Sequence, residues 1–187
     1  MCIRDRKISD QLWSLLKEFS QVNFSVSFDG YKKINDYIRW GSDFDAIRAN
    51  CYRVLDQGHH LAFQSVFSMY NATRMHEVFE FYDKEFPQCN TLVQPASGIN
   101  GYLGPWHNPL RKQILESMYR CQQTRVCYNG GRNTSNLVEE VINRVKNNDY
   151  NAELLAKFFA YNDRIDRARG SRLGDYIPEL EQARSLL

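Results

Sequence analysis

The stretch VNFSVSFDGYKKINDYIRWGSDFDAIRANC, from Val22 to Cys51, decides the fold that we predict for this chain. Its first seven residues, Val22 to Phe28, combine apolar, β-branched and small side chains, which is typical of a strand covered on both faces. Asp29-Gly30 then forms a pair that commonly ends a strand in a turn. A helix is expected at about Phe44 to Gln57, because apolar residues recur there at helical spacing. The stretch therefore predicts a strand and a covering helix, which together make half of a parallel crossover unit.

Strands and helices continue to alternate along the chain. Further strands are predicted at about His60–Met69 and Asn90–Gln94, a first helix at 9–20, and a third helix from Asn71 or Thr73 to about Glu85. Because helices of about 12–15 residues separate the strands, the strands are expected to run parallel. Three parallel strands are too few to close a barrel. We therefore predict an α/β fold: an incomplete (half) partial TIM-like barrel of parallel strands with crossover helices.

The expected helices carry recognisable end signals. Ser9 or Asp10 is predicted to cap the first helix and Ser42 or Asp43 the second, since short polar side chains accept hydrogen bonds from free N–H groups. Gly58 lies where the second helix should end.

The character of the chain changes after Gln94. Pro95 to Pro109 is rich in Gly, Pro and aromatic residues and predicts a loop. Helices follow at about 109–123 (capped by Asn108), 135–146 and 152–167, with a break at 129–136 and an irregular tail. We accordingly assign residues 7–108 to the C-terminal half of the barrel and residues 109–187 to a helical C-terminal extension.

The first six residues have a different origin in our interpretation. MCIRDR, Met1 to Arg6, resembles the translated end of a sequencing adaptor. Residues 1–6 are therefore expected to be non-native, and the chain to be a C-terminal fragment of a longer protein. An ordinary charged tail is the alternative.

The composition favours a soluble, packed protein in a reducing compartment. The chain has 187 residues, 43% hydrophobic and 25% charged, and a formal net charge of +2 that gives no argument for nucleic acid or a membrane surface. We expect no signal peptide, and no apolar run reaches the roughly 18 residues that a membrane helix needs. Its five cysteines are scattered, which fits reduced thiols and a cytoplasmic protein.

Candidate site residues gather where the predicted strands end. Ser27 and Asp29 finish the first strand, Asn71 follows the second, and Arg39 lies one short segment after Asp29. Ligands collect at the carboxyl ends of parallel strands. A guanidinium holds a carboxylate through two parallel hydrogen bonds, and a serine hydroxyl adds a third. This set predicts a site for a zwitterionic amino-acid group.

The same residues resemble the middle of radical S-adenosylmethionine (SAM) enzymes, in the branch that carries SPASM or twitch auxiliary domains. The resemblance rests on SFDG at 27–30, on YIR at 37–39, on the pattern FDxIxxNxxxLxxxG from Phe44 (its Leu one place late), and on Tyr70-Asn71. It covers about residues 8–95 well and 155–180 loosely.

The resemblance implies roles for the four candidates. Ser27 and Arg39 would contact the methionyl carboxylate of SAM, Asn71 would lie near the ribose or the methionyl end, and Asp29 would face the substrate or brace the mouth. In the intact parent, SAM and a 4Fe-4S cluster would yield a 5′-deoxyadenosyl radical that acts on a substrate such as a peptide or protein, with an electron donor as a further partner.

The sequence departs from that family in one essential feature. The CxxxCxxC loop that holds the cluster is absent, and Cys121 and Cys127 lack the spacing of a SPASM set. No metal ligand is therefore assigned, and the fragment alone is expected to be inactive.

Plainer interpretations stay open beside these roles. The chain could be a cofactor-free TIM-barrel-like enzyme or a non-catalytic α/β binding module with an apolar patch around 102–106. The four side chains also have ordinary alternatives: a serine bonded to its own backbone (Ser27), a turn residue (Asp29), a partner of Asp36 or Asp43 (Arg39), and a helix cap (Asn71).

Overall fold

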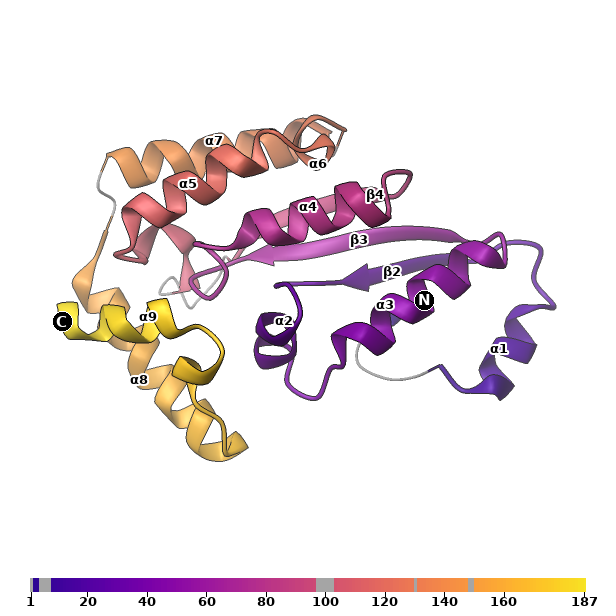
Figure 1. Ribbon diagram of the computed structural model, residues 1–187, viewed down its shortest axis with the longest axis horizontal. Coiled ribbons are helices and arrows are strands. Elements are labelled where there is room, and N and C mark those ends of the chain that lie inside the picture. Colours follow the sequence, from indigo (N-terminus) through magenta and orange to yellow (C-terminus); the bar gives the residue numbers. More distant parts are fainter. Residues whose placement is uncertain (1, 4–7, 97–102, 130, 148–149) are drawn as a thin grey trace.

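The computed structural model describes residues 2–3, 8–96, 103–129, 131–147 and 150–187, and its strands and helices alternate through the first half of the chain (Figure 1). In chain order the elements are Cys2–Ile3 (β1), Asp10–Leu16 (α1), Asn23–Ser27 (β2), Lys33–Ile38 (α2), Phe44–Asp56 (α3), His60–Phe67 (β3), Met75–Glu85 (α4), Asn90–Pro95 (β4), Arg111–Cys121 (α5), Arg125–Asn129 (α6), Gly131–Lys146 (α7), Ala152–Arg169 (α8) and Pro178–Gln182 (α9). Short 3-10 helices occupy Pro105–His107, Leu173–Asp175 and Ala183–Leu186.

The strands form an open parallel sheet in the order β1-β2-β3-β4. Val26 of β2 pairs with Phe63 of β3, and Phe63 pairs with Thr91 of β4, all in parallel register. The prediction of parallel strands joined by helices is therefore confirmed. β1 pairs with β2 through Cys2 and Ile3, and residues 1 and 4–6 of the presumed adaptor segment lie outside the described residues.

Several local signals act as predicted. The Ser9 side chain accepts a hydrogen bond from the Leu12 N–H, and the Asp43 side chain accepts one from the Ala46 N–H, so each caps the helix that follows it. Gly58 adopts a positive φ of 77° just after Gln57, the C-cap of α3, and this conformation costs glycine little.

Other boundaries differ from the sequence prediction. α4 begins at Met75 and α5 at Arg111, a few residues later than expected. α7 begins at Gly131, inside the predicted break, and the tail contains α9. Packing explains α7: the apolar stripe of its later turns is buried, and this tertiary gain outweighs the weak helix propensity of its first residues.

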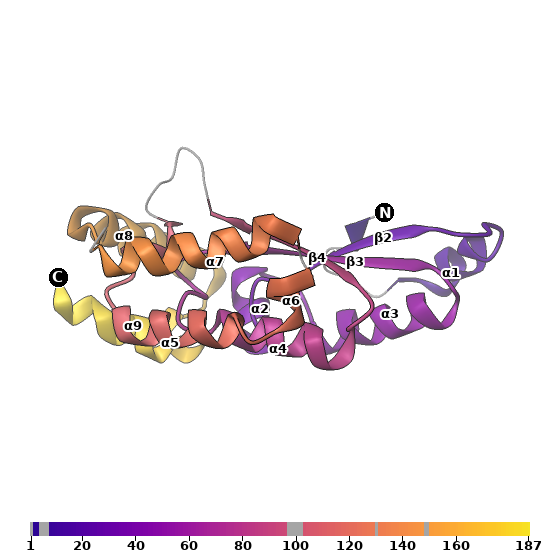
Figure 2. The same cartoon turned by 90° about the horizontal axis from the view of Figure 1, so that it is seen from above.

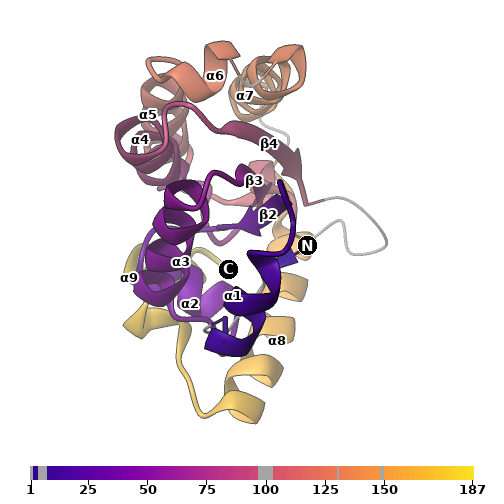
Figure 3. The same ribbon diagram turned by 90° about the vertical axis from the view of Figure 1, so that its right-hand side faces the viewer.

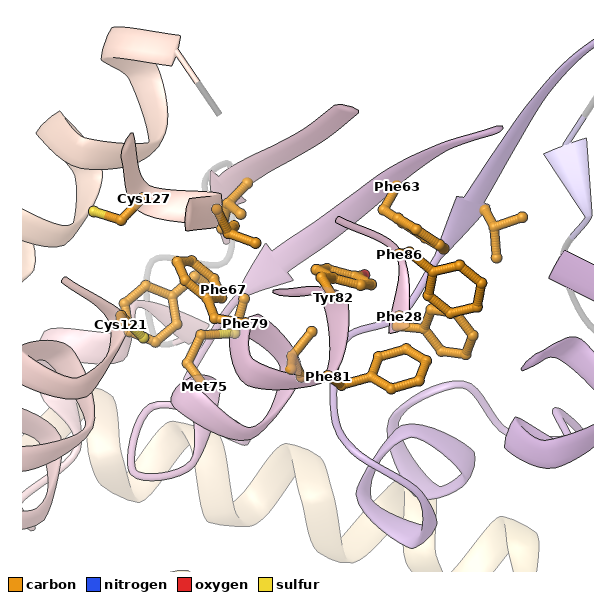
Figure 4. Close-up of a cluster of buried hydrophobic side chains, with 14 of the residues drawn as sticks. Phe28, Phe63, Phe67, Met75, Phe79, Phe81, Tyr82, Phe86, Cys121 and Cys127 are labelled. Atoms are coloured by element: carbon orange, nitrogen blue, oxygen red, sulfur yellow. The ribbon is translucent and has the colours of Figure 1, made fainter. Parts of the chain in front are cut away.

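The main core lies between the sheet and the helices on one of its faces. Phe24, Val26 and Phe28 point from β2 and its end into this core, and Phe63 and Phe67 do so from β3. Figure 4 shows the aromatic side chains of the sheet meeting those of α4, and Figure 3 shows α3 and α4 on the same side of β2 and β3. The Phe63 and Tyr82 rings stack with centroids 4.4 Å apart.

The opposite face of the sheet is open. Ser25 and Ser27 of β2 are only partly buried, Gln64 of β3 is exposed, and Val66 keeps 37% of its surface exposed. The expectation that the first strand is covered on both faces is therefore wrong. Small and polar residues fit either environment, so composition alone did not distinguish an open face from a buried one.

A second, smaller core joins the C-terminal helices to α2. Ile34 and Tyr37 of α2 pack with Leu155, Phe158 and other apolar residues of α8, α9 and the turn before α9. α5 and α7 instead contribute to the main core. Figure 1 shows the arrowheads of β2 and β3 pointing towards the side where α8 and α9 lie, and Figure 2 gives the same arrangement from above. The predicted division at residue 108 stays a prediction.

Within the described segments no helix has both the length and the apolar character needed to cross a membrane.

Candidate functional site

The carboxyl ends of β2 and β3 are joined by a buried carboxylate. Asp29 lies just beyond β2, and its Oδ1 accepts a hydrogen bond from the Val66 backbone N–H at 2.7 Å. Its Oδ2 forms an ion pair with the Arg39 guanidinium at 2.8 Å. The Asp29 side chain thus takes the place of the carbonyl that a longer β2 would offer to β3.

Burial of the Asp29 carboxyl and the partners that it binds shift its pKa in opposite directions. Burial raises the pKa of Asp29, because the charged form loses water. The Arg39 charge and the hydrogen bond from Val66 act in the opposite direction and lower this pKa, but burial is the larger effect. The ion pair therefore compensates only part of the cost of placing a charge here.

We call the edge of the sheet where β2 and β3 end the rim. Asn71 lies on the β3 side of this rim. Its Nδ2 donates hydrogen bonds to the Asp29 and Val66 carbonyls, both at 2.7 Å, and its Oδ1 accepts one from the Ser68 N–H at 2.7 Å. The expectation that Asn71 starts α4 is wrong, since that helix begins at Met75 without a side-chain cap. Asn71 instead ties the turn after β3 to the end of β2.

Arg39 keeps one hydrogen-bond donor unused. It follows α2, and its side chain is 17% exposed. While one terminal nitrogen pairs with Asp29, its Nε is buried and has no hydrogen-bond partner among the described residues. A buried N–H without an acceptor is uncommon and costly, so an oxygen atom that reached Nε would gain a hydrogen bond.

Ser27 lies apart from these three residues in its contacts. It is the last residue of β2, pairs in register with Gln64, and is half-buried on the same face as Ser25. No hydrogen bond between its side chain and Arg39 or Asp29 is found within the described residues. The structure therefore brings together Asp29, Arg39 and Asn71, and places Ser27 on the neighbouring open face.

Two rim residues escaped the sequence analysis. Asn35, fully buried in α2, accepts a hydrogen bond from the Asp29 N–H at 3.0 Å. Ser65 of β3 donates to the Phe28 carbonyl at 2.6 Å and bonds the Tyr82 hydroxyl at 3.0 Å. Ser65 could have been noticed, because it is the one polar residue at the inward positions of β3; Asn35 carries no such signal.

The C-terminal helices brace the same end of the sheet. The Tyr37 hydroxyl of α2 lies 2.9 Å from Oδ1 of Asn162 and 2.9 Å from Oδ1 of Asp166, both on α8, so it can donate its one hydrogen to either. Tyr70, beside Asn71, packs its ring edge-on against Phe158 of α8. The rim therefore lies between the main core and the second core.

The four cysteines whose side chains the structure describes, Cys51, Cys89, Cys121 and Cys127, do not gather into a metal centre. Burial raises the pKa of Cys51 to about 12 and that of Cys89 to about 11, and it raises the pKa of Cys121 as well. A thiol must lose its proton to bind iron or zinc, so these environments oppose ligation. The described residues contain no group of three or more His, Cys, Asp or Glu side chains that could hold a metal ion.

Comparison with known proteins adds no assignment to this geometry. No family model matches the chain, and the searches of curated proteins and of solved structures find no match.

Proposed function

We propose that this chain is part of a radical SAM enzyme and that its parallel strands form half of a partial TIM-like barrel. The observation that carries the proposal is the open, polar face of an all-parallel sheet. Such sheets are normally covered on both faces. Ser25, Ser27 and Gln64, on the uncovered face, would then line the interior of the barrel.

The amino-acid end of SAM would bind at the rim. The unpaired Nε of Arg39 offers a charge-assisted hydrogen bond to a carboxylate, and the Ser27 hydroxyl belongs to the same strand end. Asp29 and Asn71 would act as braces, because their polar atoms are already bonded to Arg39, Val66 and the nearby backbone.

The iron–sulfur cluster does not fit the residues of this chain. Of its four described cysteines three are buried and Cys89 is half-buried, burial raises their pKa values, and no three potential ligands come together among the described residues. The ligands of a cluster would have to come from outside the described residues. The proposal for this chain is therefore limited to holding SAM, and we derive no redox step from it.

A binding experiment with two ligands tests this proposal. S-adenosylhomocysteine carries the amino-acid group of SAM, whereas 5′-methylthioadenosine lacks it. We expect calorimetry on the purified chain to detect the first ligand and to give a dissociation constant at least about tenfold higher for the second, since charge-assisted hydrogen bonds contribute about 1.5–3 kcal/mol.

A substitution of Arg39 tests whether this residue binds the amino-acid group of the ligand. Arg39→Lys keeps the positive charge beside Asp29 but removes Nε and the planar fork, so it should weaken S-adenosylhomocysteine binding about tenfold. Arg48→Lys is the matched control, because Arg48 pairs with Glu85 away from the rim. Equal binding of both ligands, or an Arg39→Lys protein that binds normally and has an unchanged circular dichroism spectrum, would contradict the proposal.

A non-catalytic α/β binding module is the second candidate. The saturated bonding of Asp29 and Asn71 favours it, because side chains that only brace a fold need no ligand. The apolar patch suggested for this alternative receives less support. Residues 101–102 lie outside the described residues, and the Arg144 guanidinium covers the Trp106 ring at 3.6 Å. Absence of nucleoside binding in the experiment above would favour this candidate.

A further inference from the structure

A cavity of about 660 Å³ lies between the start of α2 and α4. One wall is the start of α2, with Tyr31, Lys32 and Lys33, and the other is the exposed side of α4 from Arg74 to Glu85. We call this cavity the α2–α4 groove. Its volume falls within the range of about 300–1,000 Å³ that is usual for ligand sites.

The charged side chains of the groove that lack an oppositely charged partner among the described residues are positive. Each of its carboxylates is already held by an arginine, in the pairs Arg74–Glu77, Arg120–Glu80 and Arg48–Glu85. Lys32, Lys33 and Lys84 are exposed and have no carboxylate partner among the described residues. The three amino groups come from both walls and are therefore available to a negatively charged occupant.

Aromatic rings line the groove between these charges. Phe81 is buried at its base, and the half-buried Tyr31 packs against it with ring centroids 5.8 Å apart. Tyr176 stacks on Tyr37 and closes the groove from the C-terminal side. Fixed rings of this kind give a flat apolar surface for an aromatic or aliphatic side chain.

The length of the groove favours a peptide over a small ion. The α4 wall from Arg74 to Glu85 extends about 16 Å at 1.5 Å per residue. An extended peptide covers this distance in about five residues. A single phosphate or carboxylate would reach only one end of it.

Lys32 is held in a strained conformation beside this groove. Its φ is 50° and its ψ is −123°, in a turn closed by a hydrogen bond from the Ile34 N–H to the Tyr31 carbonyl at 3.3 Å. Glycine is the usual residue at such a turn position. Strained backbone of this kind clusters at binding and catalytic sites, which gives an observation independent of the charge.

We propose that the α2–α4 groove binds an extended acidic peptide segment of about five residues. Its carboxylates would pair with Lys32, Lys33 and Lys84, and an apolar side chain would lie against Tyr31 and Tyr176. The groove shares no lining residue with the rim, so this inference stands whether or not the chain holds SAM.

Fluorescence anisotropy with a defined peptide tests the inference. The probe is dye-labelled acetyl-Glu-Asp-Phe-Glu-Glu, and its neutral counterpart carries Gln and Asn in place of the acids. We expect the acidic peptide to bind the purified chain, and we expect Lys33→Glu/Lys84→Glu to reduce its affinity at least about tenfold, since two attractive pairs become repulsive. Lys17→Glu/Lys112→Glu is the matched control: it makes the same charge change outside the groove and should stay within about twofold.

Four results would overturn the inference. They are no binding of the acidic peptide, equal binding of the neutral peptide, equal weakening by the control variant, and displacement by inorganic phosphate at the concentration at which free glutamate displaces the probe, which would indicate a general small-anion site. The Arg39→Lys protein should bind the peptide normally, so failure here is distinguishable from failure of the SAM proposal.

Discussion

The two faces of the sheet differ although they are built from alternate residues of the same strands. On β3, Phe63 and Phe67 are each 1% exposed, whereas Gln64 and Val66 between them face outwards. The first pair packs in the core, and the second meets no covering layer among the described helices. The difference teaches that stability of this fold comes from one face, which leaves the other free to carry side chains for a different purpose.

The largest difference in unfolding free energy is expected between two substitutions at neighbouring positions of β3. Phe63→Ala should lower the free energy of unfolding by about 4 kcal/mol, because it removes a ring stacked on Tyr82 and packed against Phe86. Gln64→Ala, one residue further on the open face, should change it by less than about 0.5 kcal/mol. Urea denaturation measures both. Similar losses in the two variants would mean that the open face is covered in solution.

The next largest loss of unfolding free energy is expected at the rim, where the two faces of the sheet end. Asp29→Ala should cost about 3 kcal/mol, because it leaves the Arg39 guanidinium and the Val66 N–H without their buried acceptor. Asp29→Ala/Arg39→Met should recover part of this loss, since the unpaired charge is gone. The same denaturation series measures the recovery; a double variant less stable than the single one would show that the pair does not act as described.

The smallest expected effect is the pH dependence of the stability of the fold that Asp29 causes. Burial raises the pKa of Asp29 above its value in the unfolded chain, so the folded protein binds this proton more tightly than the unfolded protein does. Ionised Asp29 therefore costs stability above its folded pKa, and this cost disappears as the pH falls through that value. The stability of the wild type relative to Asp29→Asn should increase from about pH 7 towards about pH 4. A relative stability that falls over this interval would mean that the Arg39 charge dominates over burial.

Much of the secondary structure was predictable because its causes are local. Ser9 and Asp43 cap their helices through N–H groups three residues away, and Gly58 ends α3 by its own conformation. Asn71 was misinterpreted for the opposite reason. A local rule makes it a helix cap, but one of its hydrogen bonds reaches the Asp29 carbonyl, 42 residues earlier in the chain.

The candidate site was predictable only in outline. Strand ends predicted that Asp29, Arg39 and Asn71 would lie near one another, because parallel strands share one carboxyl edge. Their pairing was not predictable: Arg39 had nearer acids in sequence, including Asp36 and Asp43, and the fold gives it Asp29.

The sequence by itself determined the alternation of strands and helices, their parallel direction and most of their ends, since these depend on side-chain periodicity and on contacts within one turn. Only the tertiary structure decided which sheet face stays open, which acid pairs with Arg39, and which lysines share the α2–α4 groove. Those features join side chains tens of residues apart, and their energies depend on burial that no local pattern encodes.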